Sequence, residues 1–471
     1  MIKLSRTTTG TILFLIDAVL LLTSWPILLW MSRPSLTAMV HPLVDARGAI
    51  YPLADLLLLF AMGLYRRDAI QNTARSLSRV PLVVGMGATL AIVLSCLQPF
   101  LLHDAVAPGG RDQMVMFGLA VANFTLGAFI ARAAVSILLR RHVLRRRLLI
   151  VGAGQRAWEL LLILGREGRS LHDDVYLLHA SSFGAVDPRL AQDHLDRILR
   201  SADFNVATAA TEIDADLVIV APDERRGMNL QRLLECKRAG FPVVEYLTFV
   251  EKEIRRIDLK RIELGWLVFS DGFTFGALDR FLKRVFDLVV SAFVLMLTAP
   301  LILAGIIAIR LEGPGPVFYR QERVTLDERV FWIMKLRTMR VNAEAGGAVW
   351  AAEKDSRITR TGNFLRRARI DELPQLVNIL RGDMSFVGPR PERPVFVKEL
   401  ARQIPLYHER HMVKAGLTGW AQINYPYGAS VDDARSKLSY DLYYVKNFTI
   451  LFDFLILLQT LRVVLWPGGV R

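Results

Sequence analysis

The chain has 471 residues, of which 52% are hydrophobic, and its mean hydropathy is +0.32. This length allows two or three domains, and this hydropathy is typical of a membrane protein that carries a soluble portion. The formal net charge of +14 predicts anionic partners such as lipid headgroups or nucleotide phosphates. Nucleic acid is disfavoured as a partner, because the basic residues lie beside apolar segments and form no zinc-finger or helix-turn-helix pattern. The two cysteines, Cys96 and Cys236, predict no disulfide framework.

Four apolar stretches open the chain, and each is close to the roughly 20 residues that cross a bilayer. They are Thr11–Met31, Ile50–Tyr65, Val80–Leu102 and Met114–Leu139. Arginine and lysine gather before the first stretch, between the second and third, and after the fourth. Because positive loops stay in the cytoplasm, residues 1–145 are predicted to form a four-helix transmembrane unit with both ends cytoplasmic. The alternative is a set of buried core helices in a soluble domain.

Residues 146–275 are predicted to form a small Rossmann-like α/β domain and a connector. An apolar strand leads into Gly152, Gly154 and Ala157, which form a G-x-G-x-x-A turn before a helix. Further strands are expected at Asp216–Ala221 and Phe241–Tyr246. The turn can seat a pyrophosphate on the helix N-terminus. The alternative, a structural turn without a ligand, is favoured because no clear acidic residue ends a second strand about 20 residues further on, where a ribose would need it.

An apolar run from Lys283 to Arg310 contains Pro300 and is long enough to span a bilayer. A span would move the following region across the membrane, whereas a bend at Pro300 would return the chain to the same face. We expect Ser291 to help satisfy a backbone carbonyl that the bend frees. From the residues alone, a kinked span and a re-entrant hairpin over 283–310 remain equal alternatives.

A final apolar segment, Phe448–Trp466, carries Asp453, Gln459 and Arg462. Its polar residues and its terminal tryptophan favour a helix that lies in the membrane interface. The alternative is a buried helix of the soluble domain.

The chemical signal is the sequence Asp371-Glu372-Leu-Pro374-Gln375, followed by Arg390 between two prolines. One carboxylate can attack phosphorus while the other holds a divalent metal, and a fixed guanidinium can grip phosphate oxygens. Adjacent side chains on a helix point about 100° apart, so the pair can share a site only at a helix end or kink, which Pro374 favours. An isolated Asp-Glu pair is more often a solvated surface feature. The surrounding basic residues nevertheless indicate phosphate chemistry, and they are Lys335, Arg337, Arg357, Arg360, Arg366, Arg367 and Arg369.

Motifs between Lys283 and Asp441 occur in a specific order and together resemble the bacterial sugar transferases, the monotopic phosphoglycosyl transferases. They include Gly313-Pro-Gly-Pro316, Lys335-Leu-Arg337, the Asp371-Glu372 segment, Gly388-Pro-Arg390-Pro and Gly416-Leu-Thr-Gly-Trp420. The resemblance runs from Arg280 to the C-terminus and implies a catalytic domain over 276–471. The preceding units match the large form of the family. A connector reading Trp266-Leu-Val-Phe-Ser-Asp-Gly-Phe273 is similar to the exopolysaccharide-initiating branch.

The resemblance implies a membrane α/β protein whose mainly helical monotopic catalytic domain contains a re-entrant helix over 283–310. It implies transfer of a sugar-1-phosphate from a UDP-sugar to undecaprenyl phosphate with release of UMP, as the first membrane step of exopolysaccharide synthesis. The enzyme would lie at the bacterial inner membrane, with its catalytic domain on the cytoplasmic face among the membrane lipids. The sugar and the oligomeric state, a homodimer included, stay open.

Roles follow from the resemblance position by position. Asp371 would be the nucleophile that forms an aspartyl-phosphosugar, and Glu372, together with Asp371, would bind Mg²⁺. The phosphate-binding residues would be Lys335, Arg337, Arg366 and Arg390. The re-entrant helix would be marked by Lys283, Arg284, Ser291 and Pro300. The chain departs from the family pattern at loop positions, namely Thr325, Glu328, Ala348 and Ala415.

Two other classes of protein were weighed against this interpretation. A membrane-tethered nucleotide-sugar-modifying enzyme that uses NAD needs a Tyr-x-x-x-Lys motif, and no tyrosine of the chain has a lysine four residues later. A non-catalytic regulator of polysaccharide assembly is disfavoured by the intact Asp371, Glu372 and Arg390.

Overall fold

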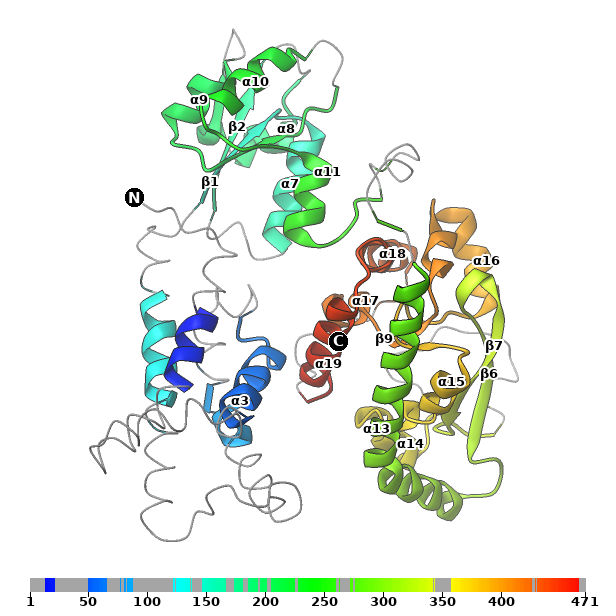
Figure 1. The fold of residues 1–471 in the computed structure, drawn as a ribbon. Helices are drawn as coiled ribbons and strands as arrows, with labels where there is room; N and C mark the ends of the chain where they lie inside the picture. The colour runs from blue at the N-terminus through cyan, green and yellow to red at the C-terminus, as the bar shows by residue number, and fades with distance from the viewer. Residues whose placement is uncertain are drawn as a thin grey trace, which may run out of the picture. The chain divides into compact units, whose positions relative to one another are not determined.

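The structure is a computed structural model that describes the larger part of the chain. The described residues are 13–21, 50–65, 83–87, 124–135, 146–166, 173–180, 185–193, 195–200, 205–224, 228–259, 276–341, 357–425 and 430–465, with a few single positions between them. The chain divides into two compact units, Met1–Phe249 and Val250–Arg471 (Figure 1).

The N-terminal unit begins with apolar helical segments. Residues 13–21 and 124–135 are helical, and α3 covers Ile50–Ala61. Arg132 donates to both carboxylate oxygens of Asp17, at 3.1 and 2.7 Å, and the Tyr65 hydroxyl donates to the same carboxylate at 2.7 Å. This buried polar cluster joins three of the four predicted apolar stretches. Large parts of those stretches lie outside the described residues, so the four transmembrane helices stay a prediction.

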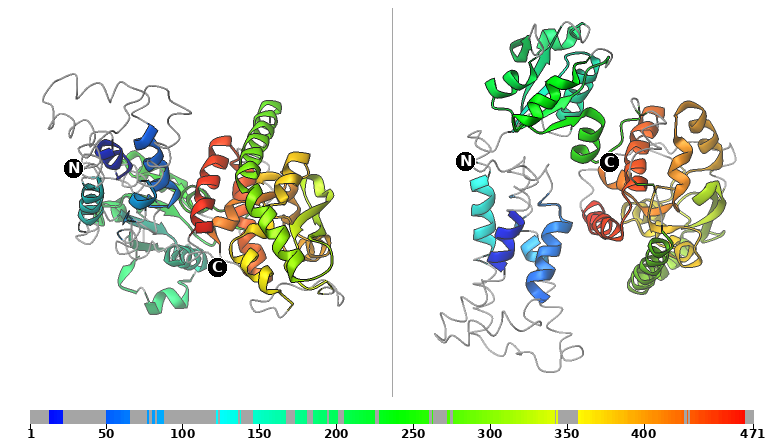
Figure 2. Two further views of the ribbon diagram at one scale, coloured as in Figure 1. Left: turned by 90° about the horizontal axis from the view of Figure 1, so that it is seen from below. Right: turned by 45° about the horizontal axis from the view of Figure 1, so that its top comes forward.

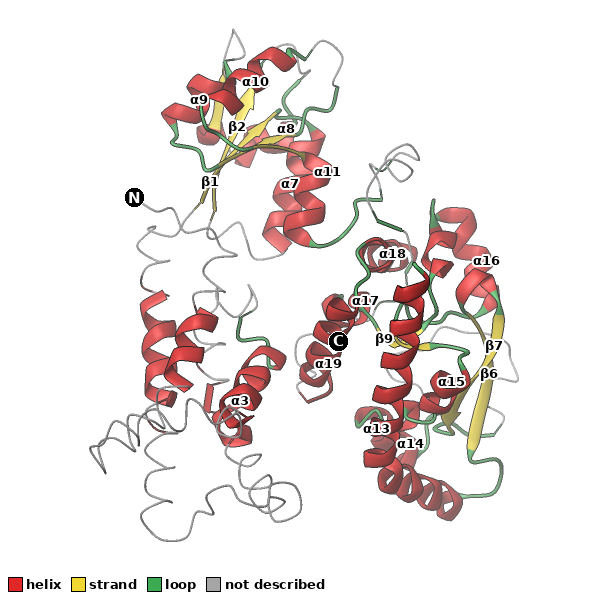
Figure 3. Ribbon diagram, viewed as in Figure 1, coloured by secondary structure: helices red, strands yellow, loops and turns green. Residues whose placement is uncertain are grey.

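The α/β part of this unit contains a five-stranded parallel sheet with strand order β3-β2-β1-β4-β5. The predicted Rossmann-like strands correspond to β1, β4 and β5, whereas β2 and β3 were not predicted. Figure 3 shows α9 and α10 on one side of the sheet and α7 and α8 on the other. In chain order the elements are β1 Arg146–Val151, α7 Gln155–Arg166, β2 Asp173–His179, α8 Pro188–Asp193, η2 Leu195–Arg197, β3 Ile198–Arg200, α9 Val206–Glu212, β4 Leu217–Val220, α10 Leu230–Arg238, β5 Val243–Glu245 and α11 Tyr246–Phe249.

The C-terminal unit is mainly helical, as predicted (Figure 2). Its core packs β7, α15, β8, α17, α18 and α19 together through buried side chains such as Leu376, Trp420 and Tyr444. Its elements are η3 Val250–Ile254, α13 Ala277–Glu312, β6 Phe318–Val324, η4 Leu326–Glu328, β7 Val330–Leu336, α14 Arg360–Arg367, η5 Ile370–Glu372, α15 Gln375–Arg381, β8 Ser385–Val387, α16 Pro394–Gln403, η6 Tyr407–Met412, β9 Gly416–Thr418, α17 Trp420–Asn424, α18 Val431–Lys446 and α19 Ile450–Leu465.

Residues 250–259 belong to the C-terminal unit by their packing. Ile257 and Leu259 are buried in a cluster with residues of α16 and α18. The Trp420 indole nitrogen donates to the carbonyl of Arg255 at 2.8 Å, and Lys446 pairs with Glu251 at 2.8 Å. This unit therefore begins upstream of residue 276, the boundary expected from the sequence.

Helix α13 is 36 residues long and contains Pro300. Among the described residues it is the helix whose length and composition suffice to cross a membrane, and only 11% of its most apolar window is buried. Figures 1 and 2 show that it changes direction along its length. Its first half contacts α15 and β8 through Arg284 and Asp287, and Gly305 in its second half lies against Leu365 of α14 and Ile370 of η5. Both halves thus dock on the same unit, while large apolar side chains such as Phe293, Met296 and Leu297 stay exposed.

Ser291 was expected to support the bend in α13, but Thr298 makes the side-chain bond to the helix backbone. Ser291 is fully buried, but its Oγ has no hydrogen-bond partner among the described residues. Instead, the Thr298 hydroxyl donates to the carbonyl of Val294 at 2.7 Å, one turn back along the helix. Bonds of this kind bend helices. Ser291 lies more than two turns before Pro300, too far from the carbonyl of Met296 that the proline leaves without its usual donor.

Helix α19 points its polar residues inward. Asp453 and Gln459 are buried against the domain, whereas Leu451, Phe454 and Leu461 are exposed. The helix also buries apolar side chains, since Ile456 lies in the core and Phe452 and Leu457 pack against it. The exposed apolar face is available for lipid, while Trp466 lies outside the described residues.

Candidate active site

The Asp-Glu pair lies where one helix has ended and the next has not begun. Helix α14 ends at Arg367, and Arg369 adopts a left-handed conformation with φ of 58°. Asp371 and Glu372 then sit in the short 3₁₀ turn η5, and α15 follows from Gln375 with Pro374 at its cap. The expectation that the pair lies at a helix end is confirmed. This break lets neighbouring carboxylates serve one site.

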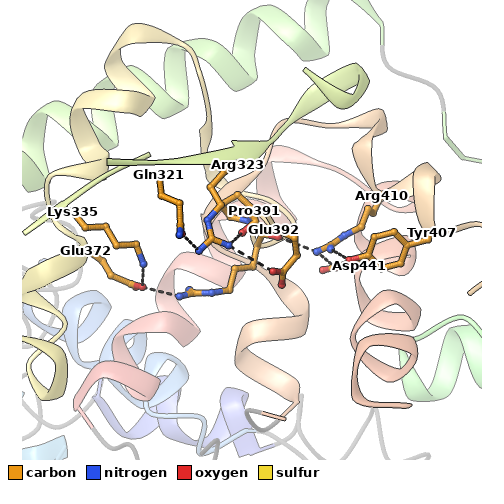
Figure 4. A network of polar contacts seen from close by, with 10 residues as sticks. Gln321, Arg323, Lys335, Glu372, Pro391, Glu392, Tyr407, Arg410 and Asp441 are labelled. Atoms are coloured by element: carbon orange, nitrogen blue, oxygen red, sulfur yellow. Dashed lines mark hydrogen bonds and ion pairs between the residues drawn. The ribbon is translucent and has the colours of Figure 1, made fainter. Parts of the chain in front are cut away.

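Glu372 is held by a cationic clamp. Its Oε1 accepts hydrogen bonds from Lys335 Nζ at 2.9 Å and from Arg390 at 2.7 Å. A guanidinium nitrogen of Arg369 lies 3.7 Å from Oε2. Figure 4 shows Lys335 and Glu372 facing each other. Burial opposes ionisation, but the charges of Arg390, Lys335 and Arg369 outweigh it and hold the pKa of Glu372 well below its usual range.

Asp371 has a different environment from its neighbour. It is 8% exposed. Burial, and next the negative charge of Glu372, raise the pKa of Asp371 to about 6 against the opposing charges of Lys335, Arg366 and Arg369. Two adjacent carboxyl groups therefore have pKa values pushed in opposite directions. Such divergence is typical of groups with separate chemical roles.

Arg390 is positioned by a second, buried ion pair. Arg410 donates to the carbonyl of Arg390 at 3.0 Å, to Asp441 at 2.7 Å and to the Tyr407 hydroxyl at 2.7 Å. Figure 4 shows Arg410 between Asp441 and Tyr407. On the other side of the same loop, Arg323 donates to the carbonyl of Pro391 at 3.1 Å. These contacts hold the carbonyls of Arg390 and of the next residue, Pro391.

The remaining predicted phosphate-binding residues divide into two groups. Arg366 donates through Nε to the Thr338 hydroxyl at 2.9 Å, and its charge acts on Asp371. Arg337 instead donates to the carbonyls of Gly313 and Pro314, at 3.1 and 2.9 Å, and so holds the turn after α13. The structure therefore brings together Lys335, Arg366 and Arg390 around the carboxylates. It gives Arg337 a structural contact that sequence reasoning did not foresee.

Lys283 and Arg284 anchor the start of α13. Lys283 pairs with Asp453 at 2.5 Å and lies 3.3 Å from Asp287. Arg284 donates to the carbonyls of Ile379 and Leu380, both at 2.7 Å. Both carbonyls lie in the last turn of α15, where backbone acceptors lack intrahelical donors. Both predicted helix residues thus fasten the apolar helix to the domain.

The G-x-G-x-x-A turn carries its own anion. The Asp223 carboxylate accepts from the backbone nitrogens of Gln155 and Arg156, at 2.7 and 2.8 Å, at the start of α7. These are the donors that a pyrophosphate would use. Strand β2 ends at His179, so no acidic residue ends it. The geometry favours the structural interpretation of this turn.

Comparison with known proteins agrees with the site. A family model described as "Bacterial sugar transferase" matches residues 278–467. A relative from Aeromonas hydrophila, named UDP-N-acetylgalactosamine-undecaprenyl-phosphate N-acetylgalactosaminephosphotransferase, is 39% identical over 61% of this chain and 67% of its own length. This chain belongs to the bacterial sugar transferase family.

Two further members of the family show how the likeness is distributed. The UDP-glucose:undecaprenyl-phosphate glucose-1-phosphate transferase of Escherichia coli is 38% identical over 49% of this chain and 56% of its own length. The exopolysaccharide production protein PSS of Rhizobium leguminosarum is 38% identical over 39% of this chain and 94% of its own length. The region that the family model matches, residues 278–467, contains Asp371 and Glu372.

Proposed function

We propose that this protein transfers a sugar-1-phosphate from a UDP-sugar to undecaprenyl phosphate and releases UMP. Two relatives are named for this reaction, with N-acetylgalactosamine and with glucose as the sugar. The observation that carries the proposal is that the two adjacent carboxyl groups have pKa values shifted in opposite directions. Glu372 is clamped by Lys335 and Arg390, whereas Asp371 has a raised pKa beside the same cations.

The reaction proceeds by two displacements at phosphorus. In the first, a carboxylate oxygen of Asp371 bonds to the phosphorus that bears the sugar, and the bond from that phosphorus to the bridging oxygen breaks, so UMP leaves. In the second, a phosphate oxygen of undecaprenyl phosphate bonds to the same phosphorus, and the aspartyl–phosphorus bond breaks. The carboxylate is restored, and the water-soluble and lipid substrates use one site in turn.

The cations make this attack feasible for a carboxylate. Several negative charges of the diphosphate repel Asp371, and fixed positive groups offset that repulsion and stabilise the departing phosphate. Lys335, Arg366 and Arg390 supply these groups on three separate elements. Of the two residues that hydrogen-bond Glu372, Arg390 is the more accessible, with 39% of its side chain exposed against 20% for Lys335.

The donor set also fits Mg²⁺. This ion takes one or two carboxylates and completes its shell with waters and substrate phosphate oxygens. Glu372, kept ionised by its neighbours, and the adjacent Asp371 would hold it. When bound, the ion supplies charge neutralisation at the diphosphate.

We place the site on the cytoplasmic face of the bacterial inner membrane, where UDP-sugars occur, and assign the reaction to the first membrane step of exopolysaccharide synthesis. Helix α13 supports a re-entrant topology, because both of its halves pack on the domain that contains Asp371. At its far end Glu312 accepts from the backbone nitrogen of Thr361, and Ile309 joins a core cluster with Leu336 and Leu365. The likeness to protein PSS supports the exopolysaccharide assignment.

Covalent labelling tests the reaction. Purified protein incubated with UDP-sugar labelled in the sugar, without lipid acceptor, should retain label and release an equal amount of UMP. Asp371→Asn should retain none, because an amide does not displace phosphate. Asp432→Asn serves as the matched control, since Asp432 is an exposed aspartate of the same domain. Equal labelling of Asp371→Asn and wild type would refute the covalent mechanism.

Cysteine accessibility tests the topology. In a background lacking Cys96 and Cys236, single cysteines at Asp279 and Glu312 should both be protected from a membrane-impermeant thiol reagent in intact cells. Both should react once the membrane is permeabilised. Reaction at Glu312 from the outside of intact cells would exclude the re-entrant topology.

A further inference from the structure

A second cluster of chemically active side chains lies away from the carboxylate pair. It consists of Glu328, from the turn between β6 and β7, and of His408 and His411, from η6. One potential ligand atom from each residue lies within 4.8 Å of the others. The Glu328 Oε1 contacts His408 Nδ1 and lies 4.0 Å from His411 Nδ1.

The Nδ1 nitrogen of the buried His411 makes no hydrogen bond with the described residues. His411 is 6% exposed. An unpaired buried nitrogen costs free energy unless something binds it. Burial, and next Arg410 and His408, lower the pKa of His411 to about 3, so the imidazole is neutral and keeps a lone pair.

The acidic member is held in an uncommon backbone conformation. Asp327 and Glu328 have φ values of 52° and 58°, in the left-handed region that glycine adopts without strain. Two consecutive non-glycine residues in this region cost stability unless the surroundings compensate. The conformation carries the Glu328 carboxylate to the two histidines.

We propose that Glu328, His408 and His411 form a binding site for a zinc-class divalent ion, separate from the Mg²⁺ site of the catalytic carboxylates. Two imidazoles and one carboxylate are a common zinc ligand set that leaves a fourth position for water. Ligand atoms of a tetrahedral zinc ion lie about 3.4 Å apart, given bonds of about 2.1 Å, so small side-chain rotations bring the three groups into place. The nearby charge of Arg410 is offset by Asp441 at 2.7 Å.

The ion would tie two segments that each lie next to a contact with the loop of Arg390: Val324 donates to the carbonyl of Glu392 at 3.0 Å, and Arg410 donates to the carbonyl of Arg390. One segment is the β6–β7 turn, and the other is η6. With Glu328 on one segment and the histidines on the other, the ion joins them by bonds much stronger than the present contacts. We infer a structural role that stiffens the support of Arg390.

Zinc binding by the full-length, tag-free protein in detergent tests the site, with Co²⁺ as a spectroscopic probe. Wild type should bind one Zn²⁺ and should give the visible absorption of tetrahedral Co²⁺, with excess Mg²⁺ present throughout. Glu328→Gln and His408→Ala should each weaken Zn²⁺ binding at least tenfold. His179→Gln, which changes a histidine of the other unit, should bind as wild type does.

A second variant, Glu328→Gly, tests whether lost zinc binding results from misfolding rather than from loss of a ligand. Glycine accepts the positive φ, so this variant should be at least as stable as wild type without metal. Zn²⁺ should raise the unfolding temperature of wild type but not that of Glu328→Gly. Equal zinc responses in the two proteins, unchanged affinity in His408→Ala, or wild-type binding no tighter than millimolar would each overturn the site.

Discussion

Replacing Asp371, the proposed nucleophile, should make the protein more stable while it abolishes turnover. The reason is that Asp371 is ionised in a place that disfavours its charge. Its pKa is raised from 3.8 to about 6, chiefly by burial and next by Glu372. A carboxyl group whose pKa is higher in the folded than in the unfolded protein binds its proton more tightly when folded. Its ionisation therefore lowers stability as pH rises through this range.

The size of the effect follows from the same values. Each unit of pKa difference corresponds to about 1.4 kcal/mol, so the ionised Asp371 costs about 3 kcal/mol above pH 7. Below about pH 3 both states are protonated and the cost vanishes. Asp371→Asn removes the charge at every pH. The variant should gain up to about 3 kcal/mol over wild type at pH 7.5 and less than about 1 kcal/mol near pH 4.

Denaturant unfolding in detergent, followed by tryptophan fluorescence at several pH values, measures this difference. Chelator is present and substrates are omitted, because any ligand that binds the folded state would add its own stabilisation. The exposed control Asp432→Asn should change stability by less than about 1 kcal/mol, without the same pH dependence. A destabilised Asp371→Asn, or a gain that persists unchanged at pH 4, would refute the electrostatic account of Asp371.

Three further results are expected. Release of UMP in the first half-reaction should fall about tenfold between pH 7 and pH 5 as Asp371 is protonated, measured without lipid so that the lipid phosphate does not titrate. Glu372→Gln should move this decline to lower pH. A decline centred near pH 4 in wild type would contradict the raised pKa of Asp371. Arg410→Lys should slow UMP release at least tenfold and destabilise the fold by about 3 kcal/mol, because lysine cannot hold Asp441, Tyr407 and the Arg390 carbonyl together. If the variant releases UMP as fast as wild type, this support of Arg390 is dispensable. Asp223→Ala should cost the α/β unit about 1 kcal/mol in thermal unfolding and leave sugar-phosphate transfer unchanged, so a tenfold loss of transfer in folded protein would give that turn a role in catalysis.

Local patterns predicted the parts of the site that depend on local backbone geometry. Pro374 and the Asp-Glu spacing indicated a helix end, and the structure places the pair in such a break. Strands β1, β4 and β5 were likewise readable from apolar runs beside turn residues. Strand β3 has only three residues, and β2 begins with Asp173 and Asp174, so neither carried a strong apolar signal.

Contacts between distant segments could not be read in the same way. Arg410 and Asp441 are far apart in sequence, and nothing in their neighbours marks them as a buried pair. Arg337 was assigned to phosphate from the family resemblance, as part of the motif Lys335-Leu-Arg337. Strand β7 ends at Leu336, however, and the carbonyls of Gly313 and Pro314 take the guanidinium. Basic composition identified an anionic substrate but did not distinguish arginines that bind it from arginines that hold the fold.

The electrostatics of the site separate two residues that the sequence alone presents as a pair. Lys335 and Arg390 both donate to one oxygen of Glu372, so their charges stabilise that carboxylate in every protonation state of its neighbour. Asp371 lies beside a permanent negative charge and inside the protein, and both factors make its own charge less stable and its oxygen a better nucleophile. Exchanging the two residues would therefore not exchange their roles, since the position of the clamp decides which carboxyl group has the lowered pKa. This dependence on position explains why the order Asp-Glu, and not merely the presence of two acids, is what the proposed reaction requires.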